Sequence, residues 1–234
     1  MDQPSIFRKN LWLEQQERLM DLFALALSLL EQGESLPEGP EPEITRRLAI
    51  CCHRAEYRMD REGRGISGNL HWETKDLQQY MDLSIPVRET KAPDCQYEFQ
   101  DQQASDYGNF RKSLTIECKR LGRFHSSHTR QLNQKYVQDG ICRFLDEGHS
   151  YGRLAPCGIM IGYVQNMRFD EILKEVNAEC CTKRITELVL SNEGWQPGFA
   201  SHLNHRFDRS FPLTPFALRH IWADLRRHYR PRPN

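Results

Sequence analysis

Residues 93–121 read PDCQYEFQDQQASDYGNFRKSLTIECKRL, and this stretch decides the fold that the sequence predicts. Apolar and polar side chains alternate from Cys95 to Gln100, and Ser113 to Leu121 has the composition of a second strand. Turn-forming residues at 105–109 separate the two runs. The stretch therefore predicts a β-hairpin.

Helical spacing of apolar residues predicts helices on both sides of this hairpin. Before it, we expect helices over 8–32 and 42–59, joined by a loop rich in Pro, Glu and Gly. After it, we expect a helix (126–147), a strand (157–164), a helix (169–183), a strand (185–191) and a closing helix (213–229). This order predicts an α/β fold with a mixed sheet and helices on its faces. Residues 1–40 then form an N-terminal helical extension to a domain over 41–234.

The balance of charge argues against tight, autonomous binding of nucleic acid. The chain has 32 basic and 32 acidic residues, so its formal net charge is zero. A domain that binds nucleic acid alone usually carries a basic excess, because phosphate neutralisation supplies most of its non-specific affinity. Here the basic excess is local, because the segment after Leu203 contains seven arginines and only two aspartates. We therefore expect further protein subunits, or a second copy of the chain, to help deliver the nucleic acid.

Cysteine usage and hydropathy indicate a cytoplasmic protein. The eight cysteines include no CxxC pair, which argues against a zinc ribbon or a thioredoxin-like motif. Several lie in apolar periodic stretches, as small buried thiols do in a reducing compartment. The most apolar run, Leu22 to Leu30, is far shorter than the ~20 residues of a membrane span. We expect no membrane partner.

The second predicted strand of the hairpin carries the residues that point to chemistry. Glu117 and Lys119 are two residues apart, so their side chains leave the same face of the strand, while Ile116 and Cys118 point into the core. We therefore expect a carboxylate and an ammonium side by side at the sheet surface, with Asp94 approaching Glu117 across the hairpin. Two carboxylates suit Mg²⁺, which can polarise a phosphate and acidify a bound water. A neighbouring lysine can orient the nucleophile or stabilise negative charge.

Pro93-Asp94 and Ile116-Glu117-Cys118-Lys119, with 22 residues between Asp94 and Glu117, resemble the motif of the PD-(D/E)XK nuclease superfamily, which has the restriction-endonuclease-like fold. The resemblance extends over roughly residues 40–225 and includes the helix–strand step after the motif, as in bacterial defence nucleases. It implies that Asp94 and Glu117 bind the metal and that Lys119 takes part in catalysis. It also implies a further glutamate on the preceding helix. Glu43 is our candidate for that metal ligand, with Glu41 and Glu56 as alternatives.

Other residues near the motif have two interpretations each. Asp101 and Asp106 lie in the same hairpin and are alternatives to Asp94 as metal ligand. Tyr136 is expected to pack in the core or to position the scissile phosphate, and Arg143 to lie at the surface. Our candidates for nucleic-acid contact are Arg120, Arg123, Lys135, Tyr136, His205 and Arg206.

Together these features predict an endonuclease that hydrolyses DNA with Mg²⁺ or Mn²⁺, with RNA as an alternative substrate. The resemblance and the neutral charge favour the nuclease subunit of a bacterial antiviral or restriction-type assembly. The alternative is a catalytically inactive subunit of the same fold that acts as a structural or nucleic-acid-binding component, with Asp94, Glu117 and Lys119 vestigial.

Overall fold

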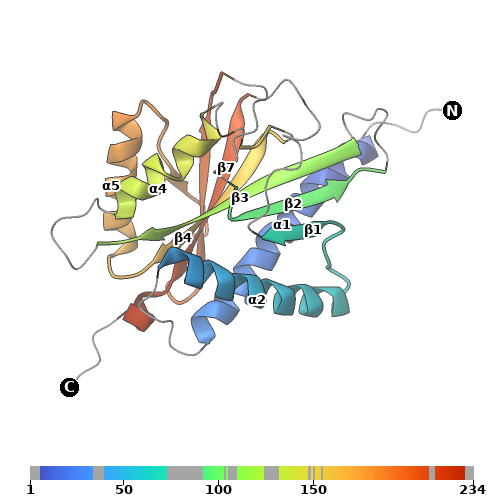
Figure 1. The fold of residues 1–234 in the computed structure, drawn as a ribbon, viewed down its shortest axis with the longest axis horizontal. Coiled ribbons are helices and arrows are strands. Elements are labelled where there is room, and N and C mark those ends of the chain that lie inside the picture. Colours follow the sequence, from blue (N-terminus) through green and yellow to red (C-terminus); the bar gives the residue numbers. More distant parts are fainter. Residues whose placement is uncertain are drawn as a thin grey trace.

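The computed structural model describes residues 6–33, 40–72, 92–102, 104, 110–123, 132–146, 149, 151–153, 155–210 and 214–229. A seven-stranded mixed sheet in the order β1-β2-β3-β4-β7-β6-β5 forms its centre (Figure 1). Strands β3, β4 and β7 run parallel to one another, and every other neighbouring pair is antiparallel. The strands are β1 (Asn69–Trp72), β2 (Cys95–Gln100), β3 (Arg111–Leu121), β4 (Cys157–Val164), β5 (Val189–Leu190), β6 (Ala200–Phe207) and β7 (Phe216–Asp224).

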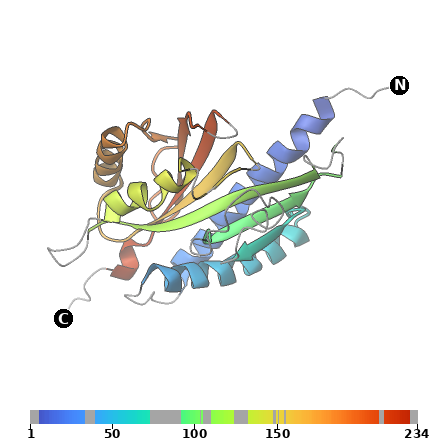
Figure 2. The ribbon, with the colours of Figure 1, turned by 45° about the horizontal axis from the view of Figure 1, so that its top comes forward.

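Helices cover both faces of this sheet, so the protein has an α/β fold (Figures 1 and 2). Helices α1 (Ile6–Gln32) and α2 (Glu41–Arg61) share one buried apolar cluster with the sheet. Helices α4 (Leu132–Gln138) and α5 (Phe169–Thr182) and the short helix η2 (Ile141–Phe144) share the cluster on the other face. The helix η3 (Arg226–Tyr229) follows the last strand.

Strand β3 is central to the sheet, and its two faces have different neighbours. Ile116 and Cys118 are buried in the cluster with α1 and α2. Glu117 is paired in register with Met160 of β4, which belongs to the opposite cluster with α4. The alternation predicted for this strand is therefore confirmed. The expected position of Glu117 and Lys119 at the sheet surface is wrong, because helices cover both faces and leave their exposed fractions at 0% and 8%.

Most of the elements predicted before residue 184 are present. The β-hairpin is confirmed by the antiparallel pairing of β2 with β3, in which Cys95 lies opposite Ile116; its predicted turn at 105–109 falls outside the described residues. The helices expected over 8–32, 42–59 and 169–183 correspond to α1, α2 and α5, and the strand expected over 157–164 is β4. Within the expected helix 126–147, the described part holds α4 and η2 instead of one continuous helix.

The C-terminal part differs from the prediction. The closing helix expected over 213–229 is wrong: residues 216–224 form β7, between β4 and β6 in the sheet. A strand buried on both faces shows no clear apolar alternation, so its period is easily mistaken for that of a buried helix. The strand expected over 185–191 is limited to β5, and β1 and β6 were not predicted at all.

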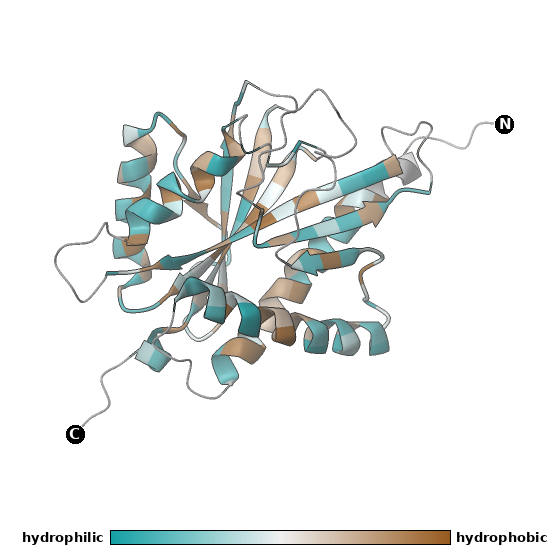
Figure 3. Ribbon diagram, in the orientation of Figure 1, coloured by the Kyte–Doolittle hydropathy of each residue, from teal (hydrophilic) through white to brown (hydrophobic). Residues whose placement is uncertain are grey.

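The long first helix packs against the same apolar cluster as α2. Its buried residues include Leu19, Leu22, Phe23, Ala26 and Leu30. Apolar segments alternate with hydrophilic ones along the helices that cover the sheet (Figure 3). Among the described residues, no helix has the length and apolarity that crossing a membrane requires.

Candidate active site at the β2–β3 hairpin

Four charged residues from three separate segments meet beside the hairpin. Lys119, on β3, places its Nζ atom 2.6 Å from Glu117 Oε1 of the same strand. The same Nζ atom lies 2.9 Å from Glu41 Oε1, at the first residue of α2, and 3.8 Å from Asp94 Oδ2, just before β2. Three carboxylates that are distant in sequence therefore surround one ammonium group.

Backbone hydrogen bonds hold two of these carboxylates in place. The N–H of Cys118 donates to Asp94 Oδ2 at 2.6 Å, and the N–H of Arg120 donates to Glu41 Oε2 at 3.0 Å. Because Cys95 pairs with Ile116 across the hairpin, the residue before Cys95 lies next to the strand segment that carries Glu117. Asp101 stands at the other end of β2, while Asp106 lies outside the described residues. Of the described candidates, Asp94 is therefore the aspartate that reaches the cluster.

The glutamate contributed by α2 is Glu41 and not Glu43. The carboxylate of Glu43 accepts hydrogen bonds from Arg46 at 3.1 Å and from Arg47 at 3.3 Å, outside the cluster. The choice of Glu43 as a third metal ligand is therefore wrong. An α-helix turns about 100° per residue, so side chains two positions apart point about 200° away from each other. Only one of these two glutamates is able to face Lys119.

Arg143 is a member of the cluster that the sequence did not identify. It lies on η2 and donates from Nη1 to Glu117 Oε1, and its side chain is 22% exposed. Its expected place as an ordinary surface residue is therefore wrong. Nothing local in the sequence singles out this arginine, since its contact depends on how the α4–η2 segment folds back over β3.

Burial sets the protonation of the cluster. It raises the pKa of Glu117 to about 7, although the positive charge of Lys119 opposes the shift. Burial also raises the pKa of Asp94, again against Lys119. Burial lowers the pKa of Lys119, but Glu117, Glu41 and Asp94 outweigh that effect and the net shift is upward. Lys119 is therefore protonated at neutral pH and acts as a hydrogen-bond donor and a positive charge, not as a base.

The donor set is compatible with one divalent ion of the Mg²⁺ type. Among the described residues, no three Asp, Glu, His or Cys side chains form a ready-made metal-binding group. Mg²⁺ needs fewer protein ligands, because it usually keeps several waters and is bound by one or two carboxylates. Glu117 Oε2 is buried, and no donor in the described part of the chain reaches it. An unpartnered buried carboxylate oxygen is costly, and a cation is one partner that removes the cost.

The cluster is open to solvent on one side. The side chains of Glu41 and Asp94 are 25% and 28% exposed, whereas that of Glu117 is fully buried. Glu117 therefore forms the floor of the site, and Glu41, Asp94 and Arg143 form its accessible rim.

Two of the residues expected to contact nucleic acid, Tyr136 and His205, are buried inside the protein. The hydroxyl of Tyr136 accepts a hydrogen bond from Trp222 Nε1 at 3.0 Å and bonds His220 Nδ1 at 2.7 Å, and the ring is fully buried. His205 is 3% exposed and bonds the carbonyl of Thr186 at 2.8 Å. Their assignment to nucleic-acid binding is wrong, and the alternative of a packing role for Tyr136 is confirmed.

The other four expected contacts do not form one surface. Arg123 is exposed and paired with Glu175 at 3.1 Å, and Arg206 is exposed on β6, near the far edge of the sheet from the hairpin. Arg120 and Lys135 are half-buried, on β3 and α4. Of the four, Arg120 is nearest the cluster, which its backbone N–H contacts directly.

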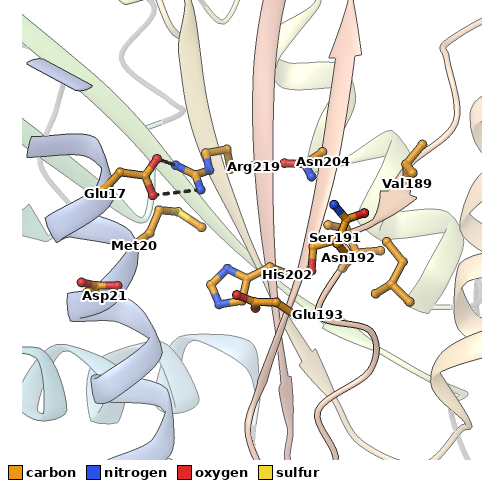
Figure 4. Close-up of a pocket in the computed structure, with 12 residues that line it drawn as sticks. Glu17, Met20, Asp21, Val189, Ser191, Asn192, Glu193, His202, Asn204 and Arg219 are labelled. Carbon is orange, nitrogen blue, oxygen red and sulfur yellow. Dashed lines mark hydrogen bonds and ion pairs between the residues drawn. The ribbon is translucent and has the colours of Figure 1, made fainter. Parts of the chain in front are cut away.

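A separate hollow of about 470 Å³ lies between α1 and the β5–β6 edge (Figure 4). Arg219 of β7 is ion-paired there with Glu17 of α1 at 2.6 Å, and His202 and Glu193 line the other side. Arg219 and His202 lie on the face of the sheet that α1 covers, opposite the face that carries Glu117. This hollow is therefore not part of the cluster.

Comparisons of the chain with protein-family models, with curated proteins and with solved structures gave no match. The function therefore has to be argued from the geometry of the cluster.

Proposed function

We propose that the protein is a metal-dependent nuclease with a restriction-endonuclease-like fold, which hydrolyses phosphodiester bonds of DNA at the Asp94–Glu117–Lys119 cluster. The observation that carries the proposal is the meeting of Asp94, Glu117 and Glu41 around Lys119, from three segments of the chain. Lys119 and Arg143 supply two positive charges against the three carboxylates, so one carboxylate is in excess of what salt bridges need. Three carboxylates, one of them buried with an unpartnered oxygen, are an arrangement that favours a further cation.

In this proposal each residue has a distinct part. Asp94 and Glu117 would hold the ion, and Glu41 holds Lys119 in place through its 2.9 Å contact. A bound Mg²⁺ or Mn²⁺ would neutralise charge on the phosphate and lower the pKa of a water. The protonated Lys119 orients the attacking water or stabilises charge that develops on the phosphoryl oxygens. Arg143 fixes Glu117 and brings a second positive charge to the rim of the site.

The neutral net charge supports a second part of the proposal. A chain with as many acidic as basic residues gains little non-specific affinity from phosphate neutralisation. We therefore place the nuclease within a bacterial antiviral or restriction-type assembly, in which another subunit or a second copy helps to hold the DNA.

One observation favours the inactive alternative. Lys119 and Arg143 both bond Glu117 Oε1, so the buried carboxylate already has positive charge beside it. A closed network of this kind is also how a nuclease fold without activity would fill the same space.

Cleavage assays separate the two functions. We expect the purified protein to cut plasmid DNA in Mg²⁺ or Mn²⁺, and Glu117→Gln and Lys119→Met to abolish cutting. Asp94→Asn should also lower the rate by at least about 100-fold, as expected for a group that holds the metal or stabilises charge in the transition state. RNA is tested in parallel.

Glu43→Gln is the matched control, because it changes a carboxylate of the same helix that lies outside the cluster. Cleavage that survives both Glu117→Gln and Lys119→Met would refute the proposal. So would the absence of cleavage by the wild-type protein with either metal, on DNA or RNA, together with its genomic neighbours; that result would favour the inactive alternative.

A further inference from the structure

The outer face of α2 carries a row of arginines without carboxylate partners. Arg54, Arg58 and Arg61 recur at i, i+4 and i+7, the spacing that places side chains on one face of a helix. All three are exposed. Within the described part of the chain, no carboxylate lies at ion-pair distance from any of them, and Arg61 instead rests over the ring of Tyr57 at 6.0 Å.

Most other arginines at the surface are ion-paired, although the exposed Arg111, Arg184 and Arg206 also have no carboxylate at ion-pair distance within the described residues. Those paired with a carboxylate of the chain are Arg18, Arg46, Arg47, Arg64, Arg123, Arg168, Arg219, Arg226 and Arg227. Glu56 projects at least about 140° away from each of the three arginines, whereas Asp60 and Glu62 flank Arg61 in the sequence and Glu62 is ion-paired with Arg64 at 2.6 Å. The row is therefore a strip of exposed positive charge that forms no ion pair within the described residues, on a chain whose net charge is zero.

Apolar side chains flank this strip. Ile50 and Tyr57 are 46% and 64% exposed, and both project within about 60° of Arg54. Exposed arginines next to an aromatic ring fit a phosphodiester backbone, because the guanidinium groups pair with phosphates while the ring offers a surface to sugars or bases.

The strip lies on the same helix as one residue of the candidate active site. Glu41, which contacts Lys119, is the first residue of α2. At 1.5 Å per residue, Arg54 and Arg61 lie about 20 and 30 Å along the helix from Glu41. A duplex rises about 3.4 Å per base pair, so these distances equal about six to nine base pairs, and because Arg54 projects about 140° around the helix from Glu41, the nucleic acid has to pass round α2 between the cluster and the strip.

We propose that Arg54, Arg58 and Arg61 form a track for the phosphodiester backbone of a nucleic acid whose scissile bond lies at the cluster. This inference rests on the proposed nuclease function and names the surface by which the substrate is held. The arginines contribute affinity and salt dependence and no base reading, because they occupy one helix face and contact phosphates alone.

Salt-dependent binding tests this track without catalysis. A labelled duplex of about 20 base pairs is titrated with protein in EDTA over about 50–200 mM KCl, and Arg54→Ala/Arg58→Ala is compared with wild type. Each lost phosphate contact reduces the slope of log K against log salt by about 0.9, so we expect a reduction of about 1.8. Single-stranded DNA and duplex RNA serve as further probes. Alanine suits exposed helix positions, so the variant should fold, which circular dichroism checks.

The control variant is Lys174→Ala/Lys183→Ala, which removes two exposed positive charges at α5 and should leave the slope unchanged. Equal slopes for wild type and the arginine variant, an equal loss in the lysine variant, or no binding of wild type to any probe overturn the track. Binding that depends on Arg54 and Arg58 without any cleavage in metal keeps the track and refutes the nuclease. Cleavage in metal together with an unchanged salt slope of the arginine variant refutes the track and keeps the nuclease.

Discussion

Replacing Lys119 with methionine should destabilise the fold in a way that depends on pH. The substitution keeps the length of the side chain and leaves Glu117 fully buried with Arg143 as its remaining charged partner. Removing one member of a buried ion pair costs about 3–5 kcal/mol. Because Arg143 still bonds Glu117, we expect the lower end, about 3 kcal/mol, near pH 8.

The sign of the pH dependence follows from Glu117. Its pKa is already raised from 4.5 to about 7 by burial, and losing Lys119 raises it further. Folded wild type releases this proton near pH 7 and the folded variant only at higher pH, so the cost of the substitution grows as the pH rises above about 7. Near pH 5 Glu117 is protonated in both folded proteins, and because pH 8 lies about one unit above the wild-type pKa of about 7, we expect the loss to shrink by up to about 1.4 kcal/mol.

Urea unfolding of wild type and Lys119→Met at about pH 5 and about pH 8 measures this difference. Arg168→Met removes a surface partner of Asp170 and serves as the matched control, with a much smaller loss at both values. In a Glu117→Gln background the cost of Lys119→Met should no longer depend on pH. A cost equal to that of the control, or one that is the same at both pH values, would show that the cluster is not a buried charge network.

Three further results are expected. Glu41→Gln should reduce DNA cleavage while Glu43→Gln leaves it unchanged, because only Glu41 contacts Lys119; equal rates for both variants would count against the cluster as described. Tyr136→Phe should lower the free energy of unfolding by about 1–3 kcal/mol, because the hydroxyl bonds His220 in the core, and should leave DNA binding unchanged. Weaker DNA binding by this variant would indicate that Tyr136 contacts the substrate. Burial lowers the pKa of His205 from 6.5 to about 4, so the unfolded chain binds a proton more readily and the folded protein loses stability as the pH falls over that range. His205→Gln should remove about 3 kcal/mol of this pH dependence of the free energy of unfolding, measured in urea. A pH dependence equal to that of wild type would contradict this prediction.

The hairpin was predictable because its information is local. Alternation within β2 and β3 fixes which side chains share a face, and the antiparallel pairing of Cys95 with Ile116 then brings Asp94 to Glu117. These relations need only strand periodicity and a turn. The burial of Glu117 was not predictable in this way, because it depends on helices that pack over the sheet from other parts of the chain.

The errors have physical causes of the same kind. Strand β7 has neighbours on both edges and buried residues on both faces, so its sequence carries no clear period. The choice between Glu41 and Glu43 depends on which face of α2 packs on the sheet, and Glu41, three residues before the buried Ile44, lies nearer that face than Glu43 does. Arg143 reaches Glu117 through the path of the chain between α4 and β4, for which the sequence gives no local signal.

Binding of Mn²⁺ to the purified protein, measured by calorimetry, tests the central claim that this cluster holds a catalytic ion. The proposal predicts one ion per chain, with affinity at least about tenfold weaker in Glu117→Gln and unchanged in Glu43→Gln. Equal affinity in all three proteins, or no binding by the wild type with or without DNA, would contradict it.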